Sequence, residues 1–295
     1  MAISVATLDW GNRTPGLFID SMVKSAKVLD RFRLIDGVKS KVQVPIFDAS
    51  LTFGSDLCAF DPQSSASIDE KEMTVSTYKW AFLNCKNVLE TTYRSVLLKQ
   101  GQHNEETMDA QFKDWVFDYF AKLSAQKALE LAATTLVAEF VADASVIDYT
   151  SVTNITPASI LGDMQGAYQA MSPVMLSAVY GDADRSLKPA FFMGTAAVQA
   201  YQIAIAGLYT TTAQGVVEGN IPAYYGMEVI HFPSLAANTF FISAPENIVM
   251  LTDEYNDVRA IDMKWEAELS SDKIWGQFKL GFSYLKGSEI VYAKN

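Results

Sequence analysis

The fold is decided by residues 41–82, which read KVQVPIFDASLTFGSDLCAFDPQSSASIDEKEMTVSTYKWAF. Val42, Val44 and Ile46 alternate with polar residues or proline, which is the two-residue period of a β-strand. A polar middle that is rich in turn residues follows, and the alternation resumes over residues 71–82. We therefore predict a long two-stranded hairpin.

A hairpin of this kind needs a surface to lie on. A two-stranded ribbon alone is marginally stable in water, and its open edges invite pairing with another chain. We expect the hairpin to lie on a neighbouring subunit, which favours an assembly function over catalysis. The residues expected at inter-subunit contacts are Leu51, Phe53, Leu57, Phe60, Asp69, Glu70 and Trp80.

The composition sets limits on the class of protein. Hydrophobic residues make up 49% of the 295 residues, which is ample for a core. Charged residues make up 19%, below the roughly 25% that is usual; this suits either burial between subunits or an ordinary soluble protein. The net charge is −11 and no basic run occurs, so we do not expect the chain to grip a phosphate backbone.

The same survey predicts a soluble chain. Two cysteines, Cys58 and Cys85, are too few for a disulfide framework. The N-terminus lacks the basic and apolar blocks of a signal peptide, and no apolar run approaches the ~18 residues of a membrane span. We expect no membrane association.

The strongest helix signal runs over residues 105–141, with Asn104 as its N-cap. Two helices broken near Ser124 are the alternative. Core side chains are expected from this helix and from the late strands, and they include Trp115, Phe120, Leu123, Met263, Trp265 and Phe282. Further helices are expected over 157–170 and 195–206, a loop over 210–220, short strands over 190–193, 227–232, 239–242 and 248–251, long strands over 258–269 and 275–285, and a last strand over 290–292.

A search for catalytic residues finds no nucleophile elbow, dinucleotide-binding glycine motif, P-loop or zinc-protease motif. His103 and His231 are the only histidines, and a structural role is the simpler interpretation of each. Asp253, Glu254 and Asp257 form the one carboxylate cluster that could bind calcium or magnesium, although a solvated loop between strands is the simpler interpretation. We predict no enzyme activity and no cofactor.

The order of these parts resembles the tailed-phage major capsid proteins of the Hong Kong 97 type. The resemblance is carried by PAFFMG at 189–194 before a helix, YGMEVI at 225–230 within a run of short strands, the paired long strands 258–269 and 275–285, and EIVY at 289–292. It covers essentially the whole chain. It implies an α+β fold with an N-terminal arm, an extended hairpin (the E-loop), a long spine helix in a peripheral lobe, and an α/β axial lobe.

The resemblance also implies a division of the chain. The arm would take residues 1–40 and the E-loop 41–82. The peripheral domain would take 83–149 and 252–286, with the spine helix at about 105–141, and the axial domain 150–251 and 287–295.

By the same resemblance, the chain would be the structural subunit of an icosahedral head that encloses double-stranded DNA, assembled in the host bacterial cytoplasm. Its partners would be copies of itself in hexamers and pentamers, a portal and decoration proteins. A separate scaffolding protein is expected because no long helical segment precedes the arm. The turn region 270–277 contains no asparagine, so covalent cross-linking to hairpin lysines is not expected.

Two alternatives stay open at this point. One is an encapsulin-like nanocompartment shell protein of the same fold. The other, from a different class, is an α/β enzyme or carbohydrate-binding module that would use Asp253, Glu254 and aromatic pairs such as Tyr224-Tyr225 and Phe240-Phe241.

Overall fold

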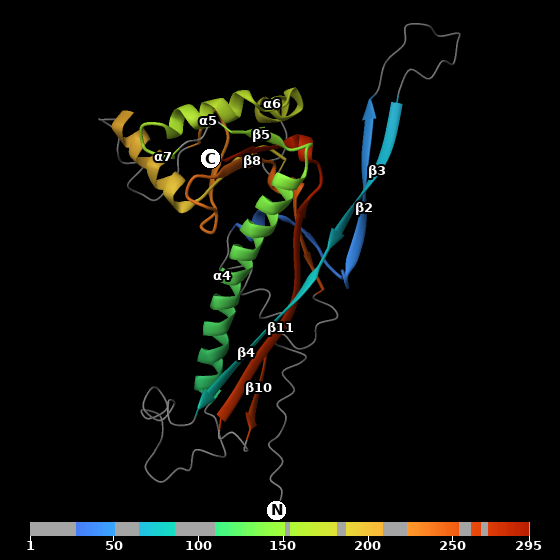
Figure 1. The fold of residues 1–295 in the computed structure, drawn as a ribbon, viewed down its shortest axis with the longest axis vertical. Helices are drawn as coiled ribbons and strands as arrows, with labels where there is room; N and C mark the ends of the chain where they lie inside the picture. The colour runs from blue at the N-terminus through green and yellow to red at the C-terminus, as the bar shows by residue number, and fades with distance from the viewer. Residues whose placement is uncertain are drawn as a thin grey trace, which may run out of the picture.

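A computed structural model of the chain describes residues 28–50, 65–85, 110–150, 154–181, 187–208, 223–253, 261–266 and 271–294. Figure 1 shows three parts. A lobe of helices over a sheet lies at one end, a long helix with long strands beside it leads away from that lobe, and a two-stranded ribbon projects from the junction. None of the helices in the described ranges is long and apolar enough to cross a membrane.

The long helix is α4 (Ala110–Ala142), whose 33 residues span about 50 Å. It is continuous through Ser124, so the alternative of two helices is wrong. Buried side chains recur along it at helical spacing and are mostly small, at Ala125, Ala128, Leu129, Ala132, Ala133, Leu136 and Phe140. Small residues allow the helix to approach the strands beside it closely. Leu123, which we expected in the core, lies outside this stripe and is exposed.

The strands beside α4 form the spine sheet. It consists of β1 (Arg33–Ile35), β4 (Ser76–Cys85), β9 (Ile248–Thr252), β10 (Ile261–Glu266) and β11 (Ser271–Tyr284). β11 is its centre, because it pairs antiparallel with β10, with β4 and with β9. Alternate β11 side chains, Ile274, Phe278, Leu280 and Phe282, are buried in the same hydrophobic core as the apolar stripe of α4.

The lobe sheet has the order β5 (Ile147–Tyr149), β12 (Ile290–Ala293), β8 (Phe240–Ser243), β6 (Ala190–Met193) and β7 (Val229–His231). The helices of the lobe are α5 (Ile160–Gln169), α6 (Pro173–Tyr180) and α7 (Thr195–Leu208). Every residue of β6, β8 and β12 is buried, as expected for strands covered on both faces. Phe192 and Phe241 pack in the core of α4, whereas Phe191 and Phe240 pack in the core of the lobe helices.

Two expectations about the parts are corrected by the strand pairing. Strand 248–251, expected in the axial lobe, is β9 and lies between β1 and β11 in the spine sheet. The described residues before the ribbon, expected as part of an N-terminal arm over 1–40, join the spine sheet, because β1 pairs with β9 and Leu29 of the 3₁₀ turn Leu29–Arg31 is buried. Both segments join the spine sheet through partners that are distant in sequence.

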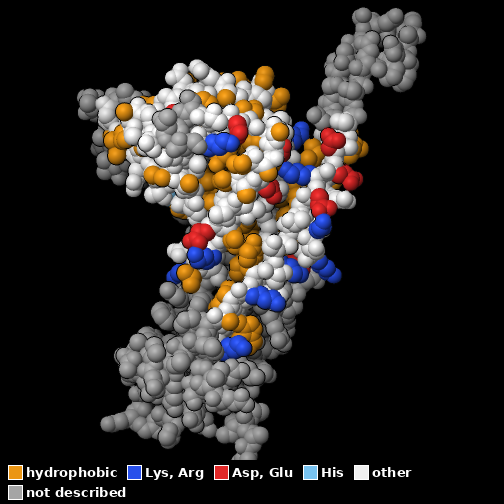
Figure 2. Space-filling view, viewed as in Figure 1, with side chains coloured by type: hydrophobic (Ala, Val, Ile, Leu, Met, Phe, Trp, Pro, Cys, Tyr) orange, Lys and Arg blue, Asp and Glu red, His pale blue; other side chains and the backbone are white. Residues whose placement is uncertain are grey.

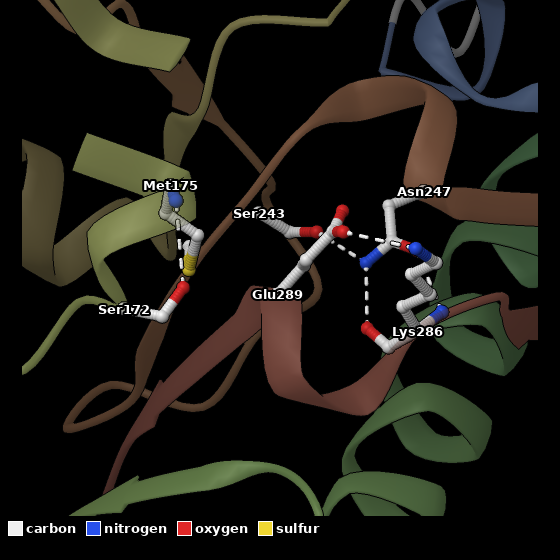
Figure 3. A network of polar contacts seen from close by, with 6 residues as sticks. All are labelled: Ser172, Met175, Ser243, Asn247, Lys286 and Glu289. Carbon is white, nitrogen blue, oxygen red and sulfur yellow. Dashed lines mark hydrogen bonds and ion pairs between the residues drawn. The ribbon is translucent and has the colours of Figure 1, made fainter. Parts of the chain in front are cut away.

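The two sheets meet at Asn247, in a 3₁₀ turn (Pro245–Asn247) that links β8 to β9. Its side-chain amide donates to Ser243 Oγ at 3.2 Å and to the Lys286 carbonyl at 3.0 Å, and its Oδ1 accepts from the Lys286 N–H at 2.9 Å (Figure 3). Lys286 lies between β11 and a second 3₁₀ turn (Gly287–Glu289), which leads to β12. One buried side chain thus ties together two of the connections between the sheets, from β8 to β9 and from β11 to β12.

Candidate assembly interface

The ribbon consists of β2 (Lys41–Ser50) and β3 (Ser65–Thr74), paired antiparallel from Lys41↔Thr74 to Ser50↔Ser65. It ends earlier than the expected hairpin. Past Val75 the chain continues as β4, which pairs with β11 and belongs to the subunit's own spine sheet. Gly281 of β11 allows this transition, because a Cβ there would lie 2.4 Å from the Thr74 carbonyl oxygen.

The two faces of the ribbon differ in their surroundings. On the inward face, Val42 and Val44 pack with Met73 against a small core that includes Val249 and Leu251 of β9. Met73 is almost completely buried. The root of the ribbon is therefore held by its own subunit, in contrast to the free-standing hairpin predicted from the sequence.

The outward face carries exposed hydrophobic side chains. Phe47 and Ile68 are directly opposite each other on the two strands, and they are 62% and 66% exposed. Cross-strand apolar pairs contribute to sheet stability, but this pair leaves most of its surface in water. It is the part of the ribbon that gains most from being covered by another molecule.

The ribbon is also acidic along β3. Asp69 and Glu70 are exposed, and Glu72 forms an exposed ion pair with Lys41. Figure 2 shows acidic side chains gathered on the ribbon, whereas the long-strand part of the subunit carries several basic ones. A partner with an apolar site beside positive charge would complement this surface.

A polar cluster lies where the ribbon meets the body of the subunit. The Lys71 ammonium lies 3.1 Å from the ring centroid of Tyr284, and the Tyr284 hydroxyl donates to Asp143. Ser283 donates to Glu139 Oε2 at 2.7 Å. Burial lowers the pKa of Lys71 and raises the pKa of Glu139, whereas the hydrogen bond from Tyr284 is the main cause that lowers the pKa of Asp143.

The expected contact residues fall into three groups. Leu51, Phe53, Leu57 and Phe60 lie outside the described residues, and Asp69 and Glu70 lie exposed on the ribbon. Trp80 is placed elsewhere: it lies on β4, packs against the subunit's own core, and its ring lies where a Cβ at Gly276 would stand. The assignment of Trp80 to the free hairpin is therefore wrong.

Of the three carboxylates considered as a cation site, only Asp253 lies among the residues that the structure describes. The Asp253 side chain is fully buried and forms an ion pair with Lys279 at 2.7 Å, which neutralises its charge. Glu254 and Asp257 lie outside the described residues. Within the described ranges, no three His, Cys, Asp or Glu side chains are grouped as metal ligands would be.

The described histidine and aromatic residues considered for an enzyme or carbohydrate-binding site make contacts within the subunit's own fold. His231 has Thr195 Oγ1 at 3.0 Å from Nε2, and burial lowers its pKa, whereas His103 lies outside the described residues. Phe240 and Phe241 are completely buried and cannot form a ligand platform. Among the tyrosines, Tyr224 donates its hydroxyl to the Leu161 carbonyl, and Tyr225 stacks on Tyr168.

The sequence survey missed the residues that the structure makes prominent. Phe47 and Ile68 gave a weak signal, because Phe47 is the one large apolar side chain among the outward positions of the β2 alternation. Lys71 gave no signal. A lysine in an acidic strand reads as solvated, and only the folded chain places it over Tyr284.

Comparison with known structures gives the fold. No protein-family model and no curated protein sequence matches the chain. The satellite phage P4 procapsid that includes the size determination (Sid) protein is similar, with a TM-score of 0.62, 10% identity and coverage of 95% of this chain and 90% of that one.

Two further structures are similar over comparable lengths. The mature capsid of bacteriophage PhiM1 has a TM-score of 0.56 at 9% identity, with coverage of 90% of this chain and 86% of that one. The virus-like particle from Pyrococcus furiosus has a TM-score of 0.55 at 12% identity, with coverage of 95% and 96%. In each of the three cases the likeness covers 90% or more of this chain. The chain therefore has the Hong Kong 97-type fold of tailed-phage major capsid proteins.

Proposed function

We propose that this chain is the structural subunit of a phage head, which self-assembles into a closed icosahedral shell around double-stranded DNA. The observation that carries the proposal is the similarity of nearly the whole chain to subunits of phage capsids. An enzyme built on part of this fold would not need the ribbon, the long helix and the lobe together. The role we propose is structural and not catalytic.

The ribbon supports the proposal by its chemistry. Its outward face presents Phe47, Ile68 and the acidic Glu70 to solvent, and the exposed Asp69 follows Ile68 directly on β3. A surface of this kind is stabilised when another copy of the chain covers it. Contact between one patch and a different patch on the next copy closes a ring when the rotation permits. Hexamers and pentamers are such rings.

Further partners follow from the same proposal. One of the similar structures includes a size determination protein, and we propose that a separate scaffolding protein directs the assembly of this chain as well. A portal and decoration proteins complete the proposed particle. We propose that the shell encloses DNA without sequence-specific binding, and the net charge of −11 supports an inner wall that does not attract the phosphate backbone. The proposed location is the virion, after assembly in the host cytoplasm.

The three parts of the fold support a revised division of the chain. We propose a peripheral domain built from α4 and the spine sheet, including β1 and β9, and an axial domain built from the lobe sheet and its helices. The E-loop would then consist of the ribbon and the residues that join its two strands.

Expression of the full chain followed by negative-stain microscopy tests the function. Closed particles of uniform diameter, with five-fold and six-fold capsomers in averaged images, are the expected result. Co-expression with neighbouring genes extends the test to a scaffolding protein. A chain that stays monomeric at high concentration, both alone and in lysates that contain those gene products, would refute the proposal.

A further inference from the structure

The polar cluster at the root of the ribbon connects three parts of the subunit. Lys71 belongs to β3 of the ribbon, Tyr284 is the last residue of β11, and Asp143 follows directly after α4. Tyr284 is almost completely buried, and its ring packs on Phe140 of α4 at a centroid distance of 5.4 Å. The ammonium of Lys71 covers this ring from the ribbon side. The ring is thus a fixed part of the body to which the ribbon binds.

Along β3, Lys71 is also the last inward residue that is partly covered. Met73, two residues closer to the root, is buried, whereas Asp69, two residues farther out, is exposed. From Lys71 to Ser65 the strand runs for about 20 Å at roughly 3.4 Å per residue. A rotation of about 10° at Lys71 would therefore move Ser65 by about 3–4 Å, a large displacement for a surface that must match another subunit.

The surroundings of Lys71 suit a cation. An ammonium over the face of an aromatic ring is attracted by the ring's quadrupole, and more strongly where water is partly excluded. Glu139 and Asp143 are close enough to favour the charged form of Lys71 electrostatically, although burial opposes it. Both carboxylates are held in place by hydrogen bonds from β11, through Ser283 and Tyr284.

We propose that Lys71 is a latch, which fixes the angle at which the ribbon leaves the subunit by seating its ammonium on Tyr284 beside Glu139 and Asp143. The buried Met73 anchors the root, and the Lys71 contact sets the direction of everything beyond it. Lys71 is a positioning residue in this role, because it acts through the direction of the ribbon beyond it. The inference rests on the geometry of one subunit and not on the proposed function.

Amide hydrogen exchange of the full chain tests the latch. Lys71→Met keeps the length of the side chain and removes its charge. We expect exchange of the ribbon peptides that cover residues 41–46 and 67–74 to become at least tenfold faster, while peptides from the lobe sheet stay unchanged. Sedimentation is used to compare each variant with the parent chain in the same oligomeric state.

Two variants serve as controls. Lys71→Arg keeps the positive charge and the contact with the ring, so its ribbon exchange should stay within about threefold of the parent. Lys41→Met removes another lysine of the same ribbon, whose ion pair with Glu72 is exposed, and it should change exchange by less than about twofold.

Three results would overturn the proposal. The first is ribbon exchange in Lys71→Met that rises no more than in Lys41→Met. The second is an equal rise in the ribbon and in the lobe sheet, which would mean general destabilisation. The third is failure of both Lys71 variants to fold, which would make Lys71 a core residue and not a latch.

Discussion

Replacement of both Phe47 and Ile68 by threonine should weaken assembly of the chain and leave the subunit folded. The two side chains are cross-strand neighbours on the outward face of the ribbon. Threonine keeps a high strand propensity, so the ribbon itself should persist. Surface substitutions outside special features usually change stability by no more than about 0.5 kcal/mol.

The size of the effect follows from the exposed surface. Full burial of a side chain of this class contributes about 1.5–3 kcal/mol. Phe47 is 62% exposed and Ile68 is 66% exposed, so more than half of that contribution is still to be gained when a neighbour covers them. The pair should therefore provide about 2–4 kcal/mol for each ribbon contact. Because threonine retains a methyl group, we expect each ribbon contact to lose about 2 kcal/mol of binding free energy. This loss corresponds to about a thirtyfold increase in the concentration needed for assembly.

Light scattering and sedimentation velocity over a concentration series measure this increase. Urea unfolding of the unassembled subunit provides the stability comparison. Leu34→Thr is the matched control, since Leu34 is an apolar strand residue on β1 that is 49% exposed and lies outside the ribbon. It should shift the assembly midpoint by less than about threefold, because Leu34 lies outside the ribbon that we propose a neighbouring copy covers.

The reasoning would be refuted by an assembly midpoint that stays within about threefold of the parent value. It would be refuted equally by a double variant whose unfolding free energy falls by more than about 1 kcal/mol, because the pair would then stabilise its own subunit.

Three further outcomes are expected. Replacement of residues 51–64 by a short Gly/Ser turn should leave native-like circular dichroism but abolish shells in micrographs; normal shells would show that the segment is not needed. Asn247→Ala should lower the unfolding free energy measured in urea by about 2–3 kcal/mol, because it leaves the buried hydrogen-bond partners of Asn247 unsatisfied. Asn238 is partly exposed, so Asn238→Ala should lower it by less than about 1 kcal/mol. Equal losses in the two variants would contradict this expectation. Glu139→Gln removes a carboxyl group whose pKa is raised by burial. The folded parent therefore keeps that proton to a higher pH than the unfolded chain does. The stability that the protonated carboxyl contributes is lost as pH rises through the raised pKa. The variant's advantage in unfolding free energy should therefore grow from about pH 4 upward and then level off, and a constant difference would contradict the assignment.

Much of the fold could be predicted from the spacing of apolar residues in the sequence. The apolar spacing before Ala142 identified the spine helix, and the alternation at Phe278, Leu280 and Phe282 identified the buried face of β11. These features are legible because a helix or strand that buries one face must repeat apolar residues at its own period. The order of such elements was sufficient to suggest the Hong Kong 97-type fold, which structural comparison supports.

The sequence did not predict which strands pair with each other. The alternation continues from β3 into β4 with no polar break at Val75, yet β3 pairs with β2 and β4 pairs with β11. Strand β9 carries the same apolar signal as its neighbours in sequence but joins the other sheet. A strand's period specifies which face is buried and leaves its neighbour unspecified.

The same distinction applies to the candidate interface, part of which could be predicted from the sequence and part of which depends on the tertiary structure. The sequence by itself indicated a two-stranded hairpin that carries Asp69 and Glu70. Only the tertiary structure decided that Trp80 belongs to the subunit's own sheet, that Phe47 and Ile68 are left uncovered, and that Lys71 lies over Tyr284. The physical reason is that burial, exposure and the contact of a cation with a ring depend on segments far apart in the chain, whose approach is fixed by packing and not by local periodicity.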